Sequence, residues 1–134
     1  MSNNTNDLKE ITKIALELLF SSNISIDEKK SKITQYINPN KYIQHSPTLA
    51  NGLGALMALV ESFDQQFDAY SIEVKRLVGE DDLVVAHCHY KLGVTDKRGK
   101  AIVEIFKFED GKMVEHWDVI QDVPATDANG NGMF

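Results

Sequence analysis

The feature that most constrains the fold of this chain is a change in hydrophobic periodicity near its midpoint. Before Asp68 the apolar residues recur every three or four positions, as on one face of a helix. After it they alternate with polar residues, as in strands. The first half therefore predicts three helices, at about 8–20, 25–36 and 52–67. In "SIDE", Ser25 and a glutamate three residues later form a capping box that starts the second helix.

The second half of the chain predicts four antiparallel strands joined by turns. They correspond to the runs 70–80, 83–94, 100–108 and 113–123. The Asp-Gly of "EDGK" is a strong hairpin signal, and "TDKRG" supplies another reverse turn. Helices followed by a meander of strands predict an α+β fold, with the helices packed on a curved antiparallel sheet and residues 1–134 forming a single domain.

Proline marks the connection between the second and third predicted helices. Pro39 disfavours helical backbone at Asn38, so the second helix ends there. The following stretch, "YIQHSPTLANG", contains Pro47 and is predicted to be a loop. Asn51, near the end of this loop, is expected to cap the third helix.

Charge and composition limit the classes of partner. The chain has 134 residues and a net charge of −6, without a cluster of Lys or Arg, which argues against nucleic acid or an anionic membrane as a partner. The apolar runs are too short to span a bilayer, and no secretory signal is visible, so we expect a cytoplasmic protein. Cys88 points away from its two histidine neighbours in a strand and is expected to be a buried thiol.

The last predicted strand sets a histidine and an aspartate between aliphatic residues on the same face. Alternation groups His116 and Asp118 with Val114 and Ile120. Glu104 repeats the pattern on the preceding strand, where its face neighbours are also apolar. A buried carboxylate costs several kcal/mol unless it is paired or protonated. Such a set of carboxylates and histidine therefore predicts either a cavity with acid–base chemistry or groups that merely pair with Lys or Arg at an interface.

The hairpin at "EDGK" fixes which of these residues face each other. Counting back from the turn places Phe108 opposite Val114, Phe106 opposite His116 and Glu104 opposite Asp118. Directly opposed side chains lie about 4.5–5.5 Å apart at Cβ. We therefore predict that the two carboxyls titrate as a coupled pair that shares a proton.

Other site motifs are weak or missing. His87-x-His89 offers two imidazoles, but no third ligand has local spacing, so no metal site is predicted. "GLGAL" lacks the lysine and the full glycine spacing of a phosphate loop, and the chain has no nucleophile motif. The sequence predicts no cofactor.

Both faces of the predicted strands are largely apolar. Helices can cover one face, and a second subunit would cover the other, which predicts a homodimer. The expected dimer face carries Val84, Ala86, Val103, Ile105 and Trp117. Trp117 is accordingly assigned to core or interface rather than to substrate binding.

Several stretches resemble the SnoaL-like polyketide cyclase family of the nuclear transport factor 2-like superfamily. They are "YIQHSP", "HCHY", "VEIFKFEDGKMVEHWDVIQ" and the closing "NGNGMF". The resemblance extends over nearly the whole chain and is strongest at Tyr42–Pro47 and Glu104–Pro124. It implies a cone-shaped α+β fold with a pocket between the concave face of the sheet and the helices. It does not define the reaction, because the superfamily includes cyclases, isomerases, dehydratases, epoxide hydrolases and non-enzymes.

The resemblance also implies roles for individual residues. The acid–base aspartate on the last strand of the aldol-type cyclases matches Asp118, whereas their assisting histidine on the preceding strand is replaced here by Glu104. We predict Asp118 as general base, with His116 and His45 as polarising or relay groups. The expected pocket lining comprises Tyr42, Met57, His87, His89 and Phe106.

The predicted function is abstraction of a proton α to a carbonyl of a small apolar substrate, as in aldol cyclisation or isomerisation. No cofactor is implied, because cyclases of this type use acid–base catalysis alone. A non-catalytic module that binds a small molecule on the same fold is the alternative from another class. A dehydratase or an epoxide hydrolase on this scaffold is the third possibility.

Overall fold

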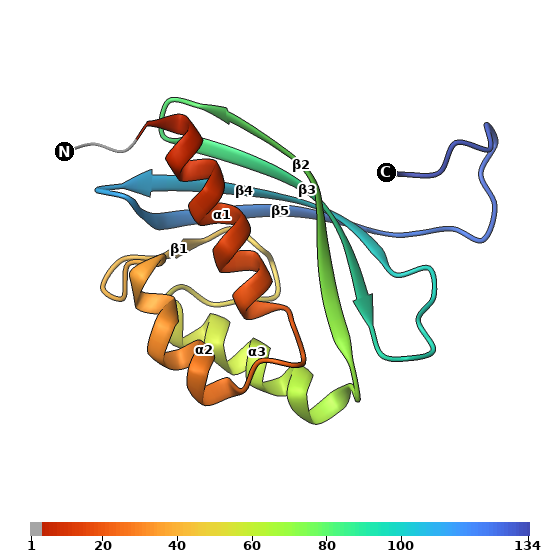
Figure 1. The fold of residues 1–134 in the computed structure, drawn as a ribbon, viewed down its shortest axis with the longest axis horizontal. Helices are drawn as coiled ribbons and strands as arrows, with labels where there is room; N and C mark the ends of the chain where they lie inside the picture. The colour runs from red at the N-terminus through yellow and green to blue at the C-terminus, as the bar shows by residue number, and fades with distance from the viewer. Residues whose placement is uncertain (1–3) are drawn as a thin grey trace.

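A computed structural model describes residues 4–134 and shows helices packed on one face of a curved, unclosed sheet (Figure 1). The helices in this range are α1 Thr5–Leu19, α2 Ile26–Lys32 with the 3-10 turn η1 Ile33–Gln35, and α3 Leu53–Gln66. The strands are β1 Ile43–Gln44, β2 Tyr70–Glu80, β3 Leu83–Leu92, β4 Lys100–Glu109 and β5 Lys112–Asp122. The predicted α+β class and the cone-shaped architecture are thus confirmed.

The sheet has the order β1-β5-β4-β3-β2, and the pairs from β2 to β5 are antiparallel as predicted. The prediction of four strands is wrong by one, because β1 lies within the supposed loop and pairs in parallel with β5. Two residues are too few to show an alternating pattern. The side chain of Asn51 does not cap α3; it accepts a hydrogen bond of 2.9 Å from the backbone N–H of Gln44 and so stabilises this short strand.

Local capping signals set where the first two helices begin. Asn4 and Asp7 form a reciprocal capping box at the start of α1. Ser25 caps α2 as predicted, by accepting a hydrogen bond of 3.2 Å from the backbone N–H of Glu28. The second helical segment is α-helical only to Lys32 and continues as the turn η1.

One core contains residues from both halves of the chain. Helix α1 packs against β2 and β3, and its buried residues meet the inner face of the sheet. Cys88 is buried there, as expected. Fully or nearly fully buried members of this core include Leu16, Ile33, Val60, Val84, Ala86 and Phe106.

The face assignment of β3 was partly wrong. Val84 and Ala86 were placed on the outer face, but they pair with Phe106 and Glu104 and therefore share the inner face with them. The outer face of β4 and β5 carries the other members of the expected dimer surface, which are Val103, Ile105 and Trp117.

The C-terminal segment returns to the outer face of the sheet. The ring of Phe134 stacks on His89, with centroids 4.1 Å apart, and on His87, at 5.6 Å. The Lys75 ammonium lies 5.5 Å from the centre of the same ring. The tail therefore covers part of β3 on the side away from the helices (Figure 1).

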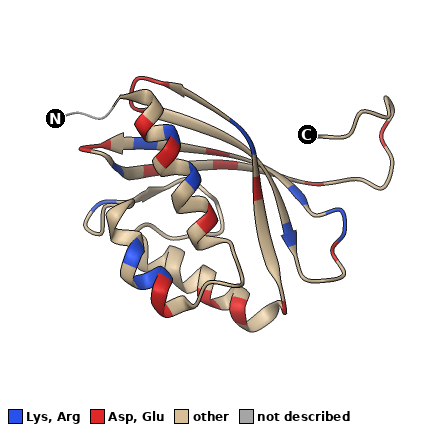
Figure 2. Ribbon diagram, in the orientation of Figure 1, with Lys and Arg blue, Asp and Glu red and all other residues tan. Residues whose placement is uncertain are grey.

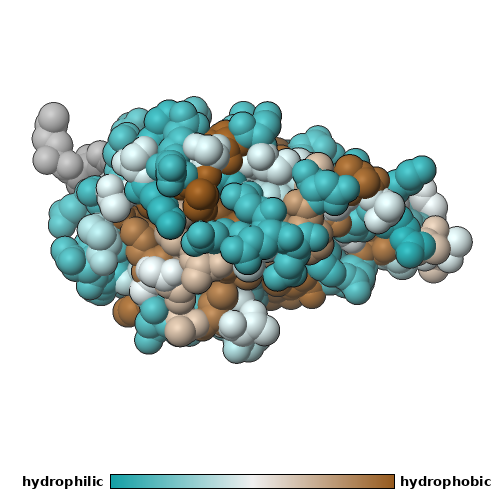
Figure 3. All heavy atoms as spheres, turned by 90° about the horizontal axis from the view of Figure 1, so that it is seen from below, coloured by the Kyte–Doolittle hydropathy of each residue, from teal (hydrophilic) through white to brown (hydrophobic). Residues whose placement is uncertain are grey.

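The surface is mixed in charge and polarity. Acidic and basic residues are interspersed along residues 4–134, without a continuous basic stripe (Figure 2). Seen from the side of α2 and α3, apolar atoms occur in patches between polar side chains (Figure 3). No helix among the described residues is both long and apolar enough to cross a membrane.

A buried lysine connects two helices to the sheet. Lys29 of α2 is fully buried, and its ammonium donates a hydrogen bond of 2.6 Å to the hydroxyl of Tyr70 on β2. That hydroxyl in turn donates to the carboxylate of Asp64 on α3. Burial lowers the pKa of Lys29, and the Asp64 carboxylate acts in the opposite direction. The network fixes α3, which forms one wall of the cavity described below.

We expect Tyr70→Phe to lower the free energy of unfolding by about 1–3 kcal/mol, because the buried Lys29 ammonium would lose its acceptor. Denaturation in urea measures the change. Tyr36→Phe is the matched control, since this partly buried tyrosine lies outside the network, and its loss should stay within about 0.5 kcal/mol. Equal stability of the two variants would show that the network contributes nothing.

Candidate acid–base site

Glu104, His116 and Asp118 form a buried cluster on the inner face of the sheet, where β4 pairs with β5. Glu104 lies opposite Asp118, and Phe106 lies opposite His116, as predicted from the hairpin. The prediction fails nearer the turn, where a register shift after Lys107 makes Phe108 pair with Met113 instead of Val114. Beyond this bulge the pairing is shifted by one residue along β5, and this shift is what brings Glu104 opposite Asp118. The count from the hairpin is right at the cluster because its error of one residue at the turn equals the shift.

Hydrogen bonds fix the position and protonation of the His116 ring. Its Nδ1 lies 2.6 Å from Oε1 of Gln44, and its Nε2 lies 3.0 Å from Oε2 of Glu104. Oε1 of Gln44 also accepts a hydrogen bond of 3.0 Å from the backbone N–H of Ser46, which identifies it as the carbonyl oxygen. Nδ1 must therefore donate to Gln44, and Nε2, facing a carboxylate, donates as well. The ring is an imidazolium in this arrangement.

The two carboxylates account for this protonation. Burial by itself would lower the pKa of His116, but Glu104, by charge and hydrogen bond, and Asp118, by charge, outweigh it and raise the pKa above its ordinary value. The sequence predicted a proton shared directly between the two carboxyls. The geometry instead places a proton on His116, between them.

Asp118 differs from Glu104 in its surroundings. Its Oδ2 lies 4.0 Å from Nε2 of His116, which is an ionic contact without a hydrogen bond. Within residues 4–134 no group donates a hydrogen bond to this carboxylate. Its side chain is nonetheless largely buried and lines a cavity. Asp118 thus has lone pairs available to a molecule bound in that cavity.

The cavity lies between the inner face of the sheet, α3 and the segment after β1. Its main chamber has a volume of about 230 Å³ and has Asp118, Glu104 and Tyr90 on the sheet side. Its opposite wall is mainly apolar, with Phe20, Leu49, Leu59 and Phe63. A smaller space of about 50 Å³ extends to His116 and is closed by Leu16, Leu56, Tyr42 and Phe106. A few polar groups therefore face an apolar wall, which is typical of a site for a small organic molecule.

Two further predicted residues lie next to the cluster. The ring of Tyr42 stacks parallel to His116 with centroids 6.3 Å apart, and Phe106 packs against the other side at 4.9 Å. Burial, together with the charges of Glu104 and Asp118, raises the pKa of Tyr42. Its hydroxyl therefore keeps its proton at neutral pH.

His45 was predicted at the pocket but lies on the other side of the sheet. Gln44 on β1 pairs with His116 and points inward, so the next residue points outward. There His45 contacts Glu115 at 2.7 Å and stacks on Trp117, with centroids 4.9 Å apart. The prediction was wrong because the parallel strand β1 was not recognised.

Three other predicted lining residues are also elsewhere. His87 and His89 lie on the outer face of β3, where His87 contacts Arg76 and His89 lies 2.7 Å from the carbonyl oxygen of Arg98. Met57 is a core residue of α3 and lines neither chamber. The face of β3 could not be derived, because the connection from Gly93 to Gly99 is too long to give a register by counting.

Two site residues were not predicted. Gln44 belongs to a strand without a sequence signal, so nothing indicated its contact with His116. Tyr90 lines the cavity from β3, and its hydroxyl has no hydrogen-bond partner. Its position was available from alternation along β3, but only once that strand's inner face was known.

The cluster also has the composition of a cation site. One ligand atom each from Glu104, His116 and Asp118 lies within 4.8 Å of the others. With Nδ1 donating to Gln44, Nε2 could bind a metal ion in place of its proton, and the Gln44 contact would be the usual outer-shell support. A divalent ion and the His116 proton therefore compete for the same position.

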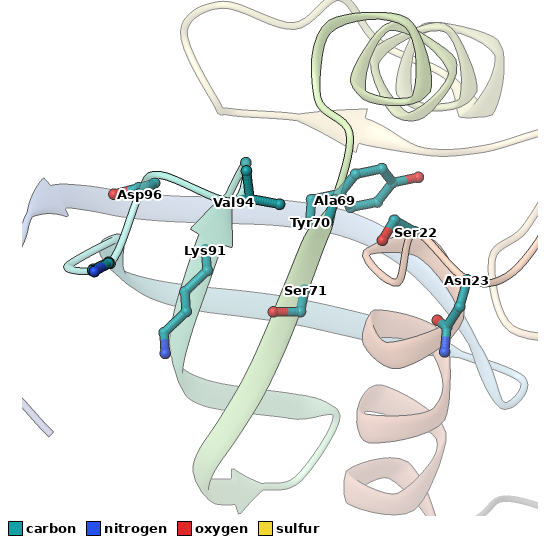
Figure 4. A pocket seen from close by; sticks show the side chains of 10 residues that line it. Ser22, Asn23, Ala69, Tyr70, Ser71, Lys91, Val94 and Asp96 are labelled. Atoms are coloured by element: carbon teal, nitrogen blue, oxygen red, sulfur yellow. The ribbon is translucent and has the colours of Figure 1, made fainter.

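A separate groove of about 730 Å³ lies along the edge strand β2 (Figure 4). Its lining comes from the connection after α1, from β2, from the end of β3 and from the connection after β3, and includes Ser22, Ser71, Lys91 and Asp96. The groove is open, and none of the three acid–base residues reaches it. The enclosed cavity is therefore the better candidate for a chemical site.

The raised pKa of His116 predicts how stability depends on pH. In the unfolded chain the pKa is about 6.5, so protonated His116 stabilises the fold fully below that pH, and this stabilisation is lost as the pH rises through the higher folded value. His116→Gln should remove this decrease in stability with rising pH. Below about pH 6.5 it should lower the free energy of unfolding by about 3–5 kcal/mol, because the carboxylates lose their cation. Urea denaturation over a pH series provides the measurement. His45→Gln is the surface control, and a profile of His116→Gln parallel to the wild-type profile would contradict the assignment.

The comparisons with known proteins agree with this fold. The chain matches the profile of the SnoaL-like polyketide cyclase family over residues 26–128. The comparison with curated proteins finds no match.

Solved structures share the architecture. TsrD from Streptomyces laurentii superposes with a TM-score of 0.67 at 17% identity, over 89% of this chain and 91% of that one. A proposed SnoaL-like isomerase from Agrobacterium tumefaciens superposes with a TM-score of 0.71 at 12% identity, over 87% of this chain and 98% of that one. A proposed ketosteroid isomerase from Kribbella flavida superposes with a TM-score of 0.66 at 11% identity, over 95% of this chain and 87% of that one. These structures share the fold, and because the family profile covers most of the chain, the protein belongs to the SnoaL-like polyketide cyclase family.

Proposed function

We propose that this protein is an acid–base enzyme that removes a proton α to the carbonyl group of a small, mainly apolar substrate. The observation that carries the proposal is the Asp118 carboxylate, which lacks a hydrogen-bond donor, faces a cavity and is held beside the His116 cation. Membership of a family of polyketide cyclases supports a reaction of the cyclase or isomerase type. The substrate itself is a separate question, taken up in part below.

Asp118 acts as the general base in this proposal. Its carboxylate takes the α-proton, the C–H electrons move toward the carbonyl oxygen, and an enolate forms. In an isomerisation, protonated Asp118 returns the proton to another carbon. In an aldol cyclisation, the enolate carbon attacks a second carbonyl, and the proton goes to the new alkoxide.

His116 and Glu104 act through Asp118 as positioning residues. The imidazolium lies 4.0 Å from the Asp118 carboxylate and places a positive charge beside it. Glu104 holds Nε2 of His116, and Gln44 holds Nδ1, so the cation keeps its place while the charge on Asp118 changes. This role replaces the polarising or relay role that the sequence suggested for His116.

Asp118→Asn should reduce turnover at least about a hundredfold while leaving the fold intact, because the His116–Glu104 contact remains. The measurement is exchange of α-protons for deuterium in β-tetralone, a bicyclic ketone, followed by NMR, together with the melting temperature. Asp68→Asn, an exposed change in the connection before β2, is the control. Undiminished exchange in folded Asp118→Asn, or none in the wild type above background, would favour a module that only binds small molecules.

We also propose that the protein forms a homodimer through the outer face of β4 and β5. Val103, Ile105 and Trp117 share this face, and the adjacent Val119 is 67% exposed. A second copy would remove this apolar strip from water.

Val119→Asp should convert the dimer into a monomer at micromolar protein concentration, because it places a charge in the middle of the apolar strip. Sedimentation velocity measures the change. Val94→Asp is matched in exposure but lies in the connection after β3, and it should leave the dimer intact. A wild-type monomer at the same concentration would refute the proposal.

A further inference from the structure

Tyr90 has the one fully buried side-chain polar atom without a hydrogen-bond partner in the described part of the chain. The residue is only 3% exposed, so water does not readily replace the missing partner. A buried hydroxyl that forms no hydrogen bond destabilises a fold, and such groups are rare in proteins. Its presence here therefore needs an explanation.

The position of Tyr90 connects it to the cavity. It follows Cys88 on the inner face of β3, pairs with Lys100 on β4, and lines the main chamber together with Glu104 and Asp118. The ring packs edge-on against Phe20, with centroids 5.1 Å apart, so the hydroxyl is held by packing and does not depend on a polar contact. The residue thus forms part of the chamber wall although its hydroxyl has no polar contact within residues 4–134.

The hydroxyl is neutral and has a proton to donate. Burial raises the pKa of Tyr90, and the carboxylates of Glu104 and Asp118 raise it further, so the proton stays on the oxygen at neutral pH. The same carboxylates disfavour an anionic ligand in the chamber, and Lys100, which also lines it, has its ammonium paired with Asp122. A neutral ligand with one hydrogen-bond acceptor fits these conditions, and the apolar side chains on the opposite wall fit its remainder.

We propose that the Tyr90 hydroxyl donates a hydrogen bond to the carbonyl oxygen of the substrate, and that the chamber selects neutral mono- or bicyclic ketones over larger ring systems. The proposal rests on the proposed function in taking the ligand to be a carbonyl compound. The size limit follows from the chamber volume of about 230 Å³, which lies below the range of about 300–1,000 Å³ usual for drug-sized ligands.

The two groups have complementary tasks in the reaction. When Asp118 takes the α-proton, negative charge develops on the carbonyl oxygen. A donor already directed at that oxygen stabilises the charge more than it stabilises the neutral ketone. Tyr90 is therefore a catalytic residue in this proposal, as well as a binding one.

Binding of cyclohexanone, β-tetralone and the tricyclic ketone anthrone tests the proposal. Isothermal titration and the NMR shift of the carbonyl carbon are measured for wild type, Tyr90→Phe and the control Tyr36→Phe, whose ring lies outside both chambers. In the wild type we expect the two smaller ketones to bind better than anthrone, with a carbonyl shift typical of a hydrogen bond. Tyr90→Phe should weaken binding of β-tetralone about tenfold and abolish the shift.

The melting temperature separates this role from a structural one. Because the hydroxyl has no partner within residues 4–134, its removal should leave the melting temperature unchanged or higher. A lower melting temperature with unchanged binding would overturn the proposal. So would an unshifted carbonyl signal in the wild type, tighter binding of anthrone, or failure of all three ketones to bind.

The result is distinguishable from failure of the proposed function. Binding with a shifted carbonyl signal but without deuterium exchange would support the role of Tyr90 in binding and remove proton abstraction by Asp118. Deuterium exchange that is unaffected by Tyr90→Phe would support proton abstraction by Asp118 and remove the role proposed for Tyr90.

Discussion

The pairing of β4 with β5 is the constraint on which the site depends. It places two carboxylates, Glu104 and Asp118, opposite each other on the buried face of the sheet. Two like charges in a core are unfavourable unless a cation or a proton compensates for them. His116, two residues before Asp118 on the same face, supplies that cation. The cluster is therefore a consequence of strand register and alternation, and neither carboxylate can be understood without the other two residues.

The short strand β1 completes this arrangement from the opposite edge. It pairs with β5 through only two residues, yet it brings the Gln44 carbonyl oxygen to Nδ1 of His116. The backbone N–H of Ser46 fixes the orientation of that amide. As a result, both ring nitrogens donate, and the donor at Nε2 faces the carboxylates. The short segment around Gln44, which has no periodic signal in the sequence, thus orients the His116 ring, while the two carboxylates raise its pKa.

The predictability of the site follows from the length of each connection. The short "EDGK" hairpin limited the register of Glu104 and Asp118 to within one residue, and the predicted pairing is correct because the bulge near the turn supplies the remaining offset of one residue. The connection from Gly93 to Gly99 gave no such count, so His87 and His89 were assigned to the pocket and Tyr90 was not. Strand β1 has too few residues for a periodic signal, so its orientation could not be derived, and His45 was predicted on the wrong face of the sheet. Fold class and helix positions came from patterns of ten or more residues, which average out such local uncertainty.

The two sides of the cavity differ in what they contribute: one side carries the polar groups, and the other is mainly apolar and sets the shape. Its acidic and hydrogen-bonding groups come mainly from strands, where backbone pairing fixes them: Gln44, Tyr90, Glu104, His116 and Asp118. The apolar wall comes largely from α1, α3 and the segment after β1, and α3 is tied to the sheet through the Lys29–Tyr70–Asp64 network rather than through strand pairing. Substitutions at Leu59 or Phe63 can therefore alter which ligand fits without displacing the proton-handling groups. The polar groups and the apolar wall can therefore vary independently, in a fold that solved structures share at 12% and 17% identity.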